Sequence, residues 1–303
     1  MAKEGQGQMP ATFRHDGKLY HPIDILRHGN KKYLILQKWQ ERYKAFDPHM
    51  QSIRSIRVRT SGVKYEMKLI QLSMIHNYSL PHIYDFFKDE HNEYLVHDWF
   101  EGLTLRLYLD RNTKKHPYFQ VDRTYYLMKG LITGLNRFHQ LGVIHGDIKP
   151  DNIIVTPKIR LVLIDFGAAW TGARTDYRNQ EMTIPYASPE QYRREKFVDC
   201  RTDQFAVSVI LYQMLTGEFP YSQYPNVNPR VPVIPPERIN KNVGTELSHI
   251  VMKGLSLDKN QRYDTSQAWL QAYLSIEEKF KAQNHQSPLT PVLTPWQKFM
   301  SIF

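Results

Sequence analysis

Two short stretches decide the fold: His145–Asn152, which reads HGDIKPDN, and Asp165–Gly167, which reads DFG. A lysine follows Asp147 by two residues and an asparagine follows it by five, and Asp165 comes thirteen residues after Asn152. This set suits phosphoryl transfer, in which one carboxylate orients an attacking hydroxyl, a carboxylate and an amide hold Mg²⁺, and a cation offsets the charge of the moving group. Either motif alone is typical of a turn or a strand end, but both at this spacing indicate a phosphotransferase.

Short apolar pieces separated by polar turns dominate the chain before position 100, and they predict strands. One exception is 63–74, where apolar residues recur at helical spacing and predict a single helix. Strands are expected at 23–26, 33–36, 43–46, 83–87 and 94–99.

After Gly102 the pattern becomes helical. A helix is expected to begin with Asp122 as its cap and to end at Gly142, and further helices are expected at 203–215, 245–255 and 265–281. Two β-rich runs, 153–155 and 161–164, predict a hairpin. The sequence therefore predicts a small strand-rich half followed by a larger helix-rich half.

With the phosphotransferase residues placed on this pattern, the sequence resembles the protein kinase superfamily. The segment Thr183–Glu190, TIPYASPE, is similar to the end of a protein kinase activation segment, and Asp203–Ala206, DQFA, is similar to the Asp-x-Trp-Ser signature that anchors the catalytic loop. Arg262 stands where the family keeps the arginine that pairs with Glu190. The resemblance spans about residues 19–280. It implies an α+β, bilobal protein-kinase-like fold, with a small antiparallel β-sheet lobe carrying one regulatory helix and a larger, mainly helical lobe.

The resemblance also divides the chain. A flexible N-terminal segment is expected at 1–16 and a protein kinase domain at 17–282, and the Pro-containing tail 283–303 follows. Within the domain, the N-lobe is expected at 17–97, the hinge at 98–102 and the C-lobe at 103–282. The apolar end of the tail, 296–303, is expected to dock on its own domain.

By resemblance, the catalytic residues are Asp147, which orients the substrate hydroxyl, and Lys149, which stabilises the phosphoryl group in transfer. Asn152 and Asp165 would hold Mg²⁺, with Mn²⁺ as an alternative, and ATP would be the phosphoryl donor. In the activation segment the expected site residues are Thr183 and Glu190. Lys149 together with Thr183 resembles serine/threonine rather than tyrosine kinases, so the expected substrate is a protein serine or threonine.

The small lobe is expected to supply a lysine for the α and β phosphates, held by a glutamate on the helix. Glu66 is the only acidic residue between positions 47 and 85, and it lies on the expected helix. Lys44 comes fifteen residues after Gly29, about the length that two strands and their turns need, whereas Lys38 leaves too little chain. We therefore predict Lys44 and Glu66 as this pair.

The remaining contacts with ATP follow from the resemblance. The backbones of Asp98 and Phe100 match the hinge that binds adenine, and His97 stands at the gatekeeper position. Gly29 is the only glycine between positions 18 and 61, where the family normally has three in the loop that covers the phosphates. This departure bears directly on nucleotide affinity.

A second departure is Gly146, which replaces the arginine of the family's His-Arg-Asp motif. Without that arginine, a phosphorylated activation segment loses its main receptor. The chain thus resembles a bacterial-type, eukaryotic-like serine/threonine kinase that lacks this arginine. Two alternatives stay open: a pseudokinase scaffold that binds nucleotide or a partner without turnover, and a small-molecule kinase of the aminoglycoside or choline type. The latter share the His-Gly-Asp motif but lack the segment 183–190 and the Asp203 signature.

Length and composition fit one folded protein: 303 residues, of which 41% are hydrophobic and 23% charged. A single cysteine, Cys200, excludes an intramolecular disulfide. No apolar run approaches the roughly 20 residues that cross a bilayer, and the polar N-terminus does not resemble a signal peptide. These features predict a cytoplasmic protein without a transmembrane segment.

The 40 Lys and Arg residues exceed the 30 Asp and Glu residues by ten. The excess is concentrated between positions 48 and 84, where five basic residues face one acid, Glu66. No motif for sequence-specific nucleic-acid binding is present. The sequence instead predicts a docking face for an acidic or phosphorylated partner, made by Arg54, Arg57, Arg59, Lys64 and Lys68.

Overall fold

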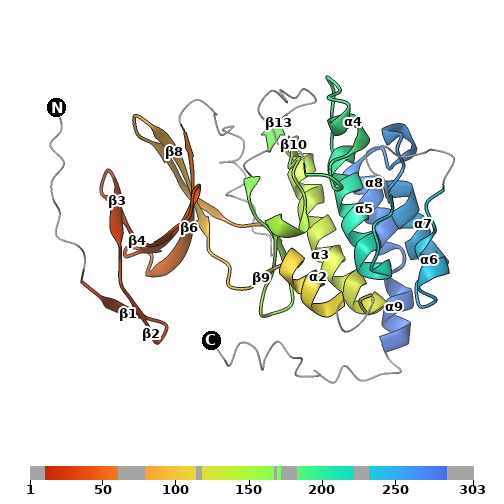
Figure 1. Cartoon of the computed structure of the whole chain (residues 1–303), viewed down its shortest axis with the longest axis horizontal. Helices are drawn as coiled ribbons and strands as arrows, with labels where there is room; N and C mark the ends of the chain where they lie inside the picture. The colour runs from red at the N-terminus through yellow and green to blue at the C-terminus, as the bar shows by residue number, and fades with distance from the viewer. Residues whose placement is uncertain are drawn as a thin grey trace. The chain divides into compact units, whose positions relative to one another are not determined.

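The computed structural model describes residues 11–60, 79–113, 118–166, 169–171, 183–221 and 232–284 (Figure 1). The chain divides into two compact units, unit 1 with residues 1–76 and 81–100 and unit 2 with residues 77–80 and 101–303. The passage from one unit to the other after Phe100 falls within the segment 98–102 that the sequence assigns to the hinge. The expected helix 63–74 and Glu66 lie outside the described residues.

Unit 1 contains a six-stranded sheet in which every neighbouring pair is antiparallel. The five strands expected from the sequence are confirmed as β3, β4, β5, β7 and β8, but β6 was not predicted. Arginines at positions 54, 57 and 59 hide its alternating pattern. In the order of the sheet, the strands are β3 (Asp24–His28), β4 (Lys31–Lys38), β5 (Arg42–Asp47), β6 (Ser52–Thr60), β8 (Asn92–Asp98) and β7 (Ile83–Lys88).

The sheet packs apolar side chains on both of its faces. One face carries a cluster that includes Tyr33, Ile56 and Val96, each at most 1% exposed. A second cluster, formed around Phe46, receives the small hairpin of β1 (Phe13–His15) and β2 (Lys18–Tyr20), and the Phe13 and Phe46 ring centroids lie 4.4 Å apart. Strand structure therefore begins at residue 13, inside the segment 1–16 that the sequence assigned to a flexible end.

Arg54 corrects one expectation about the basic stretch. Its side chain is buried, its guanidinium carbon lies 3.6 Å from the centroid of the Tyr84 ring, and its Nη1 lies 3.6 Å from the Asp98 carboxylate. An arginine enclosed in this way cannot belong to an exposed docking face. Lys64 and Lys68 lie outside the described residues, so the docking face stays a prediction, without Arg54.

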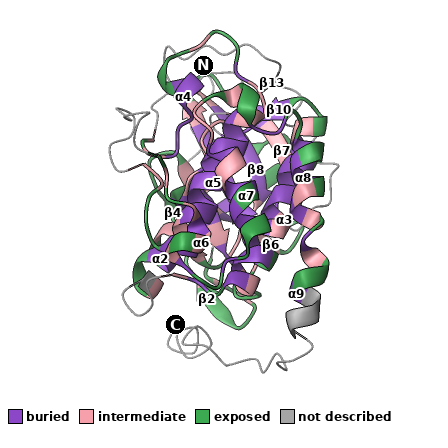
Figure 2. Ribbon diagram, turned by 90° about the vertical axis from the view of Figure 1, so that its right-hand side faces the viewer, coloured by how far each residue is buried: buried purple, intermediate pink, exposed green. Residues whose placement is uncertain are grey.

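Unit 2 is built around α5 (Arg201–Thr216), in which every residue except Arg201 and Gln213 is buried. Figure 2 shows this helix in purple, and it packs against α3 (Val121–Gln140) and α7 (Thr245–Gly254). The other helices among the described residues of unit 2 are α2 (Leu105–Thr113), α4 (Pro189–Tyr192), α6 (Pro236–Ile239), α8 (Ser266–Leu274) and α9 (Glu277–Asn284), with 3₁₀ turns η2 (Pro150–Asn152) and η5 (Lys259–Gln261).

The strands in the described part of unit 2 are short. The predicted hairpin is confirmed as β11 (Ile153–Val155) and β12 (Leu161–Leu163), and β9 (Leu103–Thr104) joins the same sheet through β11. A second, two-stranded sheet pairs β10 (Val143–Ile144) with β13 (Trp170–Thr171). The motif HGDIKPDN, residues His145–Asn152, lies between β10 and β11.

Two helix boundaries differ from the sequence prediction. Gln120, not Asp122, is the N-cap of α3. Asp122 lies in the first turn, where a negative charge interacts favourably with the helix dipole. The single helix expected over 265–281 is two helices, α8 and α9, which are separated at Ser275. The Ser275 hydroxyl donates to the Ala272 carbonyl, a local bond that competes with continuation of the helix. Within the described part of the chain, no helix is long and apolar enough to cross a bilayer.

Candidate active site

The loop between β10 and η2 carries Asp147, and α5 fixes its shape. Asp203, in the first turn of α5, is fully buried, and its carboxylate accepts the backbone N–H groups of His145 and Gly146, both at 2.9 Å. Gly146 has φ +73°, a left-handed conformation that glycine adopts readily. The prediction that the Asp203 signature anchors the catalytic loop is therefore confirmed.

A histidine completes this anchor. His139 Nε2 lies 2.7 Å from Asp203 Oδ2, and the other ring nitrogen contacts the Ser266 hydroxyl. Burial alone would raise the pKa of Asp203, but the hydrogen bond and charge of His139 outweigh it and hold the pKa below its ordinary value. The carboxylate therefore stays ionised in the interior, which strengthens its bonds to the loop. Sequence reasoning did not identify His139.

Three other predicted residues contact the Asp147 carboxylate. Lys149 Nζ lies 2.8 Å from Asp147 Oδ2 and donates to Thr183 Oγ1 at 2.8 Å. The Thr183 hydroxyl lies 3.4 Å from Asp147 Oδ1, and Asn152 Nδ2 donates to Asp147 Oδ2 at 2.9 Å. The side chains of Asp147 and Lys149 are 23% and 21% exposed. A substrate hydroxyl therefore has access to a carboxylate that already has a cation beside it.

The β11–β12 hairpin brings Asp165 to this group of residues. Ile153 faces Leu163 in the hairpin register, and the Ile164 N–H donates to the Asn152 carbonyl at 2.8 Å. Asp165 therefore follows directly on the residue that is bonded to Asn152. Its φ of +67° is uncommon for a residue with a side chain, and such strain is typical of functional sites.

Asn152 and Asp165 supply the kind of ligands that Mg²⁺ prefers. Both offer side-chain oxygens, and the amide nitrogen of Asn152 donates to Asp147, which leaves the amide oxygen for a metal. Among the described residues, no group of three or more His, Cys, Asp and Glu side chains could hold a metal ion by itself. This donor set fits Mg²⁺ that is held by two protein ligands and by the phosphates of a substrate.

His145 is buried beside Asp147. Burial lowers the pKa of its imidazole, although the nearby carboxylates of Asp203, Asp147 and Asp165 oppose this shift. Its Nδ1 accepts the Asp147 N–H at 3.3 Å, and its ring meets the Phe166 ring edge-on with centroids 5.5 Å apart. A neutral histidine in this place supports the loop by packing and by one hydrogen bond.

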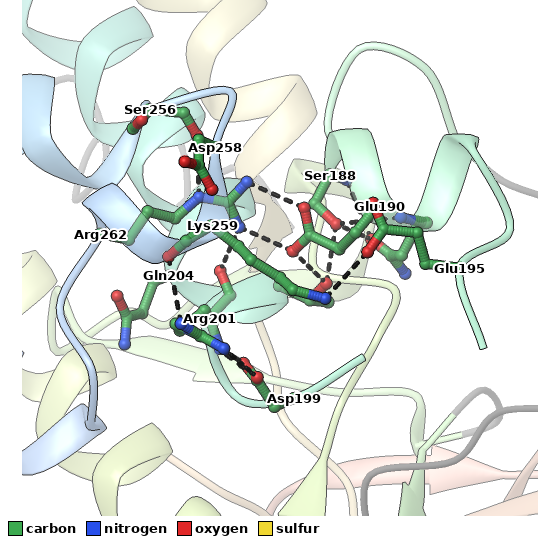
Figure 3. A network of polar contacts seen from close by, with 12 residues as sticks. Ser188, Glu190, Glu195, Asp199, Arg201, Gln204, Ser256, Asp258, Lys259 and Arg262 are labelled. Carbon is green, nitrogen blue, oxygen red and sulfur yellow. Dashed lines mark hydrogen bonds and ion pairs between the residues drawn. The ribbon is translucent and has the colours of Figure 1, made fainter. Parts of the chain in front are cut away.

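Glu190 and Arg262 form the predicted ion pair (Figure 3). Arg262 Nη1 and Nη2 donate to the two carboxylate oxygens at 2.7 and 2.9 Å, and the two side chains are 0% and 2% exposed. Burial favours the neutral acid, but Arg262 outweighs it and lowers the pKa of Glu190. Arg262 also donates to the carbonyls of Ser256 and Arg201, both bonds shorter than 3.0 Å. The pair therefore ties the end of the activation segment to α5 and η5.

Gln191 is a further contact that the sequence reasoning missed. Its amide donates to the Gly146 carbonyl at 2.6 Å, which links α4 to the catalytic loop. The same residue closes a capping box with Ser188, whose hydroxyl accepts the Gln191 N–H. A serine followed three residues later by glutamine is a helix-start signal, so the position of Gln191 could have been predicted from the sequence.

The predicted nucleotide residues of unit 1 are spread over the sheet. Gly29 lies in the β3–β4 turn with φ +54°, and no described residue other than its chain neighbours has an atom within 4 Å of the position a Cβ would take. Lys44 lies on β5, with its Nζ 4.6 Å from the centroid of the Trp99 ring. The Asp98 carbonyl lies 2.9 Å from His97 Nδ1, and its carboxylate accepts the His82 N–H and the Tyr84 hydroxyl. Glu66, the predicted partner of Lys44, lies outside the described residues.

Comparison with known proteins agrees with this geometry. The family described as "Protein kinase domain" matches residues 47–274, which is more than half of the chain. Gly29 and Lys44 precede the matched residues, whereas every other predicted site residue falls within them. The part of unit 1 that the family match does not cover therefore includes Gly29 and Lys44, two of the expected phosphate contacts.

Three similar proteins from bacteria illustrate the likeness. Over 77% of its own length, the present chain is 27% identical to a probable serine/threonine-protein kinase of Clostridium acetobutylicum. It is 32% identical to the serine/threonine-protein kinase PknB of Mycolicibacterium smegmatis over 57%, and 27% identical to the serine/threonine-protein kinase PrkC of Bacillus subtilis over 61%. The matched regions cover 36%, 28% and 29% of those proteins. With the family match over residues 47–274 and the Asp147 site in place, the chain belongs to the protein kinase family.

Proposed function

We propose that the protein is an ATP-dependent serine/threonine protein kinase, which transfers the γ-phosphoryl group of ATP to serine or threonine hydroxyls of a protein. One observation carries the proposal: Lys149 bridges Asp147 and Thr183, at 2.8 Å from each, while Asn152 donates to the same carboxylate. The names of the bacterial relatives support the choice of serine and threonine. The single cysteine supports a cytoplasmic location.

In this mechanism Asp147 orients the substrate hydroxyl and accepts its proton. The hydroxyl oxygen bonds to the γ-phosphorus as the bond to the β-phosphate oxygen breaks, and ADP leaves. Lys149 offsets the negative charge of the transferred group. Asn152 and Asp165 are the residues that would hold Mg²⁺, which neutralises phosphate charge when it is bound.

In unit 1 we propose that Lys44, held by Glu66, positions the phosphates, that the chain around Gly29 approaches them, and that the backbones of Asp98 and Phe100 bind adenine. Lys44→Met is expected to raise the KM for ATP roughly tenfold, because a charge-assisted contact is lost. Lys38→Met is a matched control on the neighbouring strand, since Lys38 pairs with Asp24 at 2.5 Å. Equal KM values for the two variants would contradict the assignment of Lys44.

The decisive experiment on the proposed function is transfer of radiolabelled phosphate from ATP to generic protein substrates. Asp147→Asn is expected to lower the rate by about 10²–10⁴-fold, because the base is lost, with an unchanged melting temperature. Asp151→Asn is the matched control in the adjoining 3₁₀ turn η2, where the carboxylate is 49% exposed and lies 3.5 Å from Arg106 Nε. Equal rates for the wild type and Asp147→Asn would overturn the proposal.

The second candidate function is a pseudokinase scaffold, and one observation favours it. Gly29 is the only glycine between positions 18 and 61, and Gly29 and Lys44 both precede the family match. Nucleotide binding without any transfer would support this reading. The same assay with a panel of aminoglycosides tests the small-molecule alternative, which predicts label on the aminoglycoside and none on protein.

A further inference from the structure

A cavity of about 370 Å³ lies within unit 1, beside the end of β8. Two tryptophans line it, Trp39 from the β4–β5 turn and Trp99 from the residue after β8. Their ring centroids lie 6.1 Å apart and their planes differ by 10°, so the two indoles stack. The other lining residues are Gln40, Glu41, Arg42 and Arg57.

The turn that carries Trp39 is fastened to the sheet at several points. The Trp39 N–H donates to the Arg42 carbonyl at 2.8 Å, which closes the turn. Glu41 accepts the Val58 N–H through its carbonyl at 2.8 Å, and its carboxylate pairs with Arg57 Nη2 at 2.6 Å. The turn is therefore held both by β6 and by the indole of Trp99.

The charges around this cavity are unbalanced. Arg42 and Arg57 line it, Lys44 lies over the Trp99 ring, and Glu41 is the acidic residue among those that line it. A cavity with stacked aromatic rings and an excess of cations suits a planar base that carries phosphate. A phosphate oxygen would compete with the Glu41 carboxylate for Arg57, and a base would compete with Trp39 for the face of Trp99.

Trp99 also lies between Asp98 and Phe100, the two residues whose backbones the proposed kinase uses for adenine. We propose that the Trp39–Trp99 stack is an aromatic clasp that covers these nucleotide-binding residues. In the absence of nucleotide, Trp39 stacks on Trp99 and Glu41 holds Arg57. A purine nucleotide binds when the Trp39–Glu41 turn moves away, so that Trp39 leaves Trp99 and Glu41 leaves Arg57. The inference rests on the proposed function, because it assumes that unit 1 binds ATP.

The clasp lowers the apparent nucleotide affinity, because only the open fraction of molecules is competent to bind. The stabilisation that is typical of an aromatic pair corresponds to roughly a two- to tenfold change in an equilibrium constant. Release of the clasp by mutation is therefore expected to tighten nucleotide binding by that factor. This outcome is opposite in sign to the loss expected if Trp39 simply contacted the nucleotide.

The test is calorimetric titration of the full chain and its Trp39→Ala variant with ADP and Mg²⁺. The variant is expected to bind roughly two- to tenfold more tightly, and Glu41→Gln, which weakens the hold on Arg57, is expected to change the affinity in the same direction. Met50→Ala is the control, because Met50 is 52% exposed on another turn of the same sheet, compared with 48% for Trp39. Unchanged or weaker binding by Trp39→Ala would overturn the clasp.

Tryptophan fluorescence gives a second readout. Saturating ADP and Mg²⁺ are expected to change the emission of the wild type more than that of Trp39→Phe. Only in the wild type does nucleotide binding separate two stacked indoles. Equal changes in the two proteins would overturn the clasp. Unchanged affinity with intact phosphoryl transfer would overturn the clasp alone, whereas the absence of both nucleotide binding and transfer would overturn the proposed function as well.

Discussion

At the scale of single residues, the Asp147 carboxylate is the point where the site converges. Its two oxygens are contacted by an ammonium, an amide and a hydroxyl. Each of these contacts restricts the carboxylate to one orientation, and an oriented base is worth more than a mobile one because the reacting geometry is already formed.

Thr183 tests this view of the site. Thr183→Val keeps the shape of the side chain but removes the hydroxyl that links Lys149 to Asp147. The turnover number is expected to fall roughly tenfold, the cost of about one hydrogen bond, while the KM for ATP stays near the wild-type value. Steady-state kinetics with a protein substrate measures both parameters.

Thr183→Ser is the control, because it retains the hydroxyl. It is expected to keep most of the activity. If both variants lose activity equally, the methyl group rather than the hydrogen bond is what matters at this position.

The sequence predicted which residues come together where the motif is local. Asp147, Lys149 and Asn152 lie within six positions, and the hairpin that brings Asp165 beside Asn152 was itself predictable from two β-rich runs. His139 was missed because it acts across 64 positions of sequence, through Asp203. Nothing in the local pattern of a helical histidine distinguishes such a contact from ordinary packing.

At the scale of elements, α5 fixes the conformation of the loop that carries Asp147. Its N-terminal Asp203 replaces solvent as the acceptor for two consecutive backbone N–H groups. Buried donors of this kind are costly to leave without an acceptor.

Asp203→Asn is therefore expected to lower both stability and activity. The amide offers one acceptor oxygen where the carboxylate offers two, so a buried N–H group loses its partner at a cost of about 1–3 kcal/mol. Thermal unfolding measures the first effect, and phosphoryl transfer well below the melting temperature measures the second.

The control is Asp199→Asn, in the turn before α5, where the carboxylate pairs with Arg201 at 2.7 Å and is 36% exposed. It is expected to change stability by less than the Asp203 variant. Equal losses for the two variants would contradict the anchoring role of α5.

The element predictions failed where side-chain chemistry hid the period. The side chains of β6 alternate between the two faces of the sheet. Arg54 is nevertheless buried, because its guanidinium packs on the Tyr84 ring and pairs with the Asp98 carboxylate. From the sequence pattern alone, such an arginine is predicted to be a surface residue. The division between α8 and α9 was missed for a related reason, since the hydrophobic period continues through Ser275.

At the scale of the whole molecule, the Glu190–Arg262 pair joins segments that are 72 positions apart. Because the pKa of Glu190 is lower in the folded chain than its ordinary 4.5, its contribution to stability is present above that value. This contribution is lost as the pH falls through the pKa that Glu190 has in the folded chain. At that pH the carboxylate takes up a proton that the unfolded chain already binds.

We therefore expect the free energy of unfolding of the wild type to fall steeply below about pH 4.5. Glu190→Gln is expected to cost about 3–5 kcal/mol at neutral pH, because Arg262 is left without its counterion, and to show a shallower dependence on pH in the acid range. Urea unfolding between about pH 7 and about pH 3 measures both effects. An unchanged acid slope would show that the pair does not control acid stability.

The stacked indoles of unit 1 have a practical consequence for experiments on the intact chain. Two near-parallel aromatic chromophores couple their electronic transitions, so they give circular dichroism that the separate rings lack. Because both rings belong to unit 1, this signal reports on the small sheet, whereas the helical signal comes from unit 2 within the described residues. The protein thus carries two intrinsic optical probes, and the unfolding of its two units can be followed separately without a label.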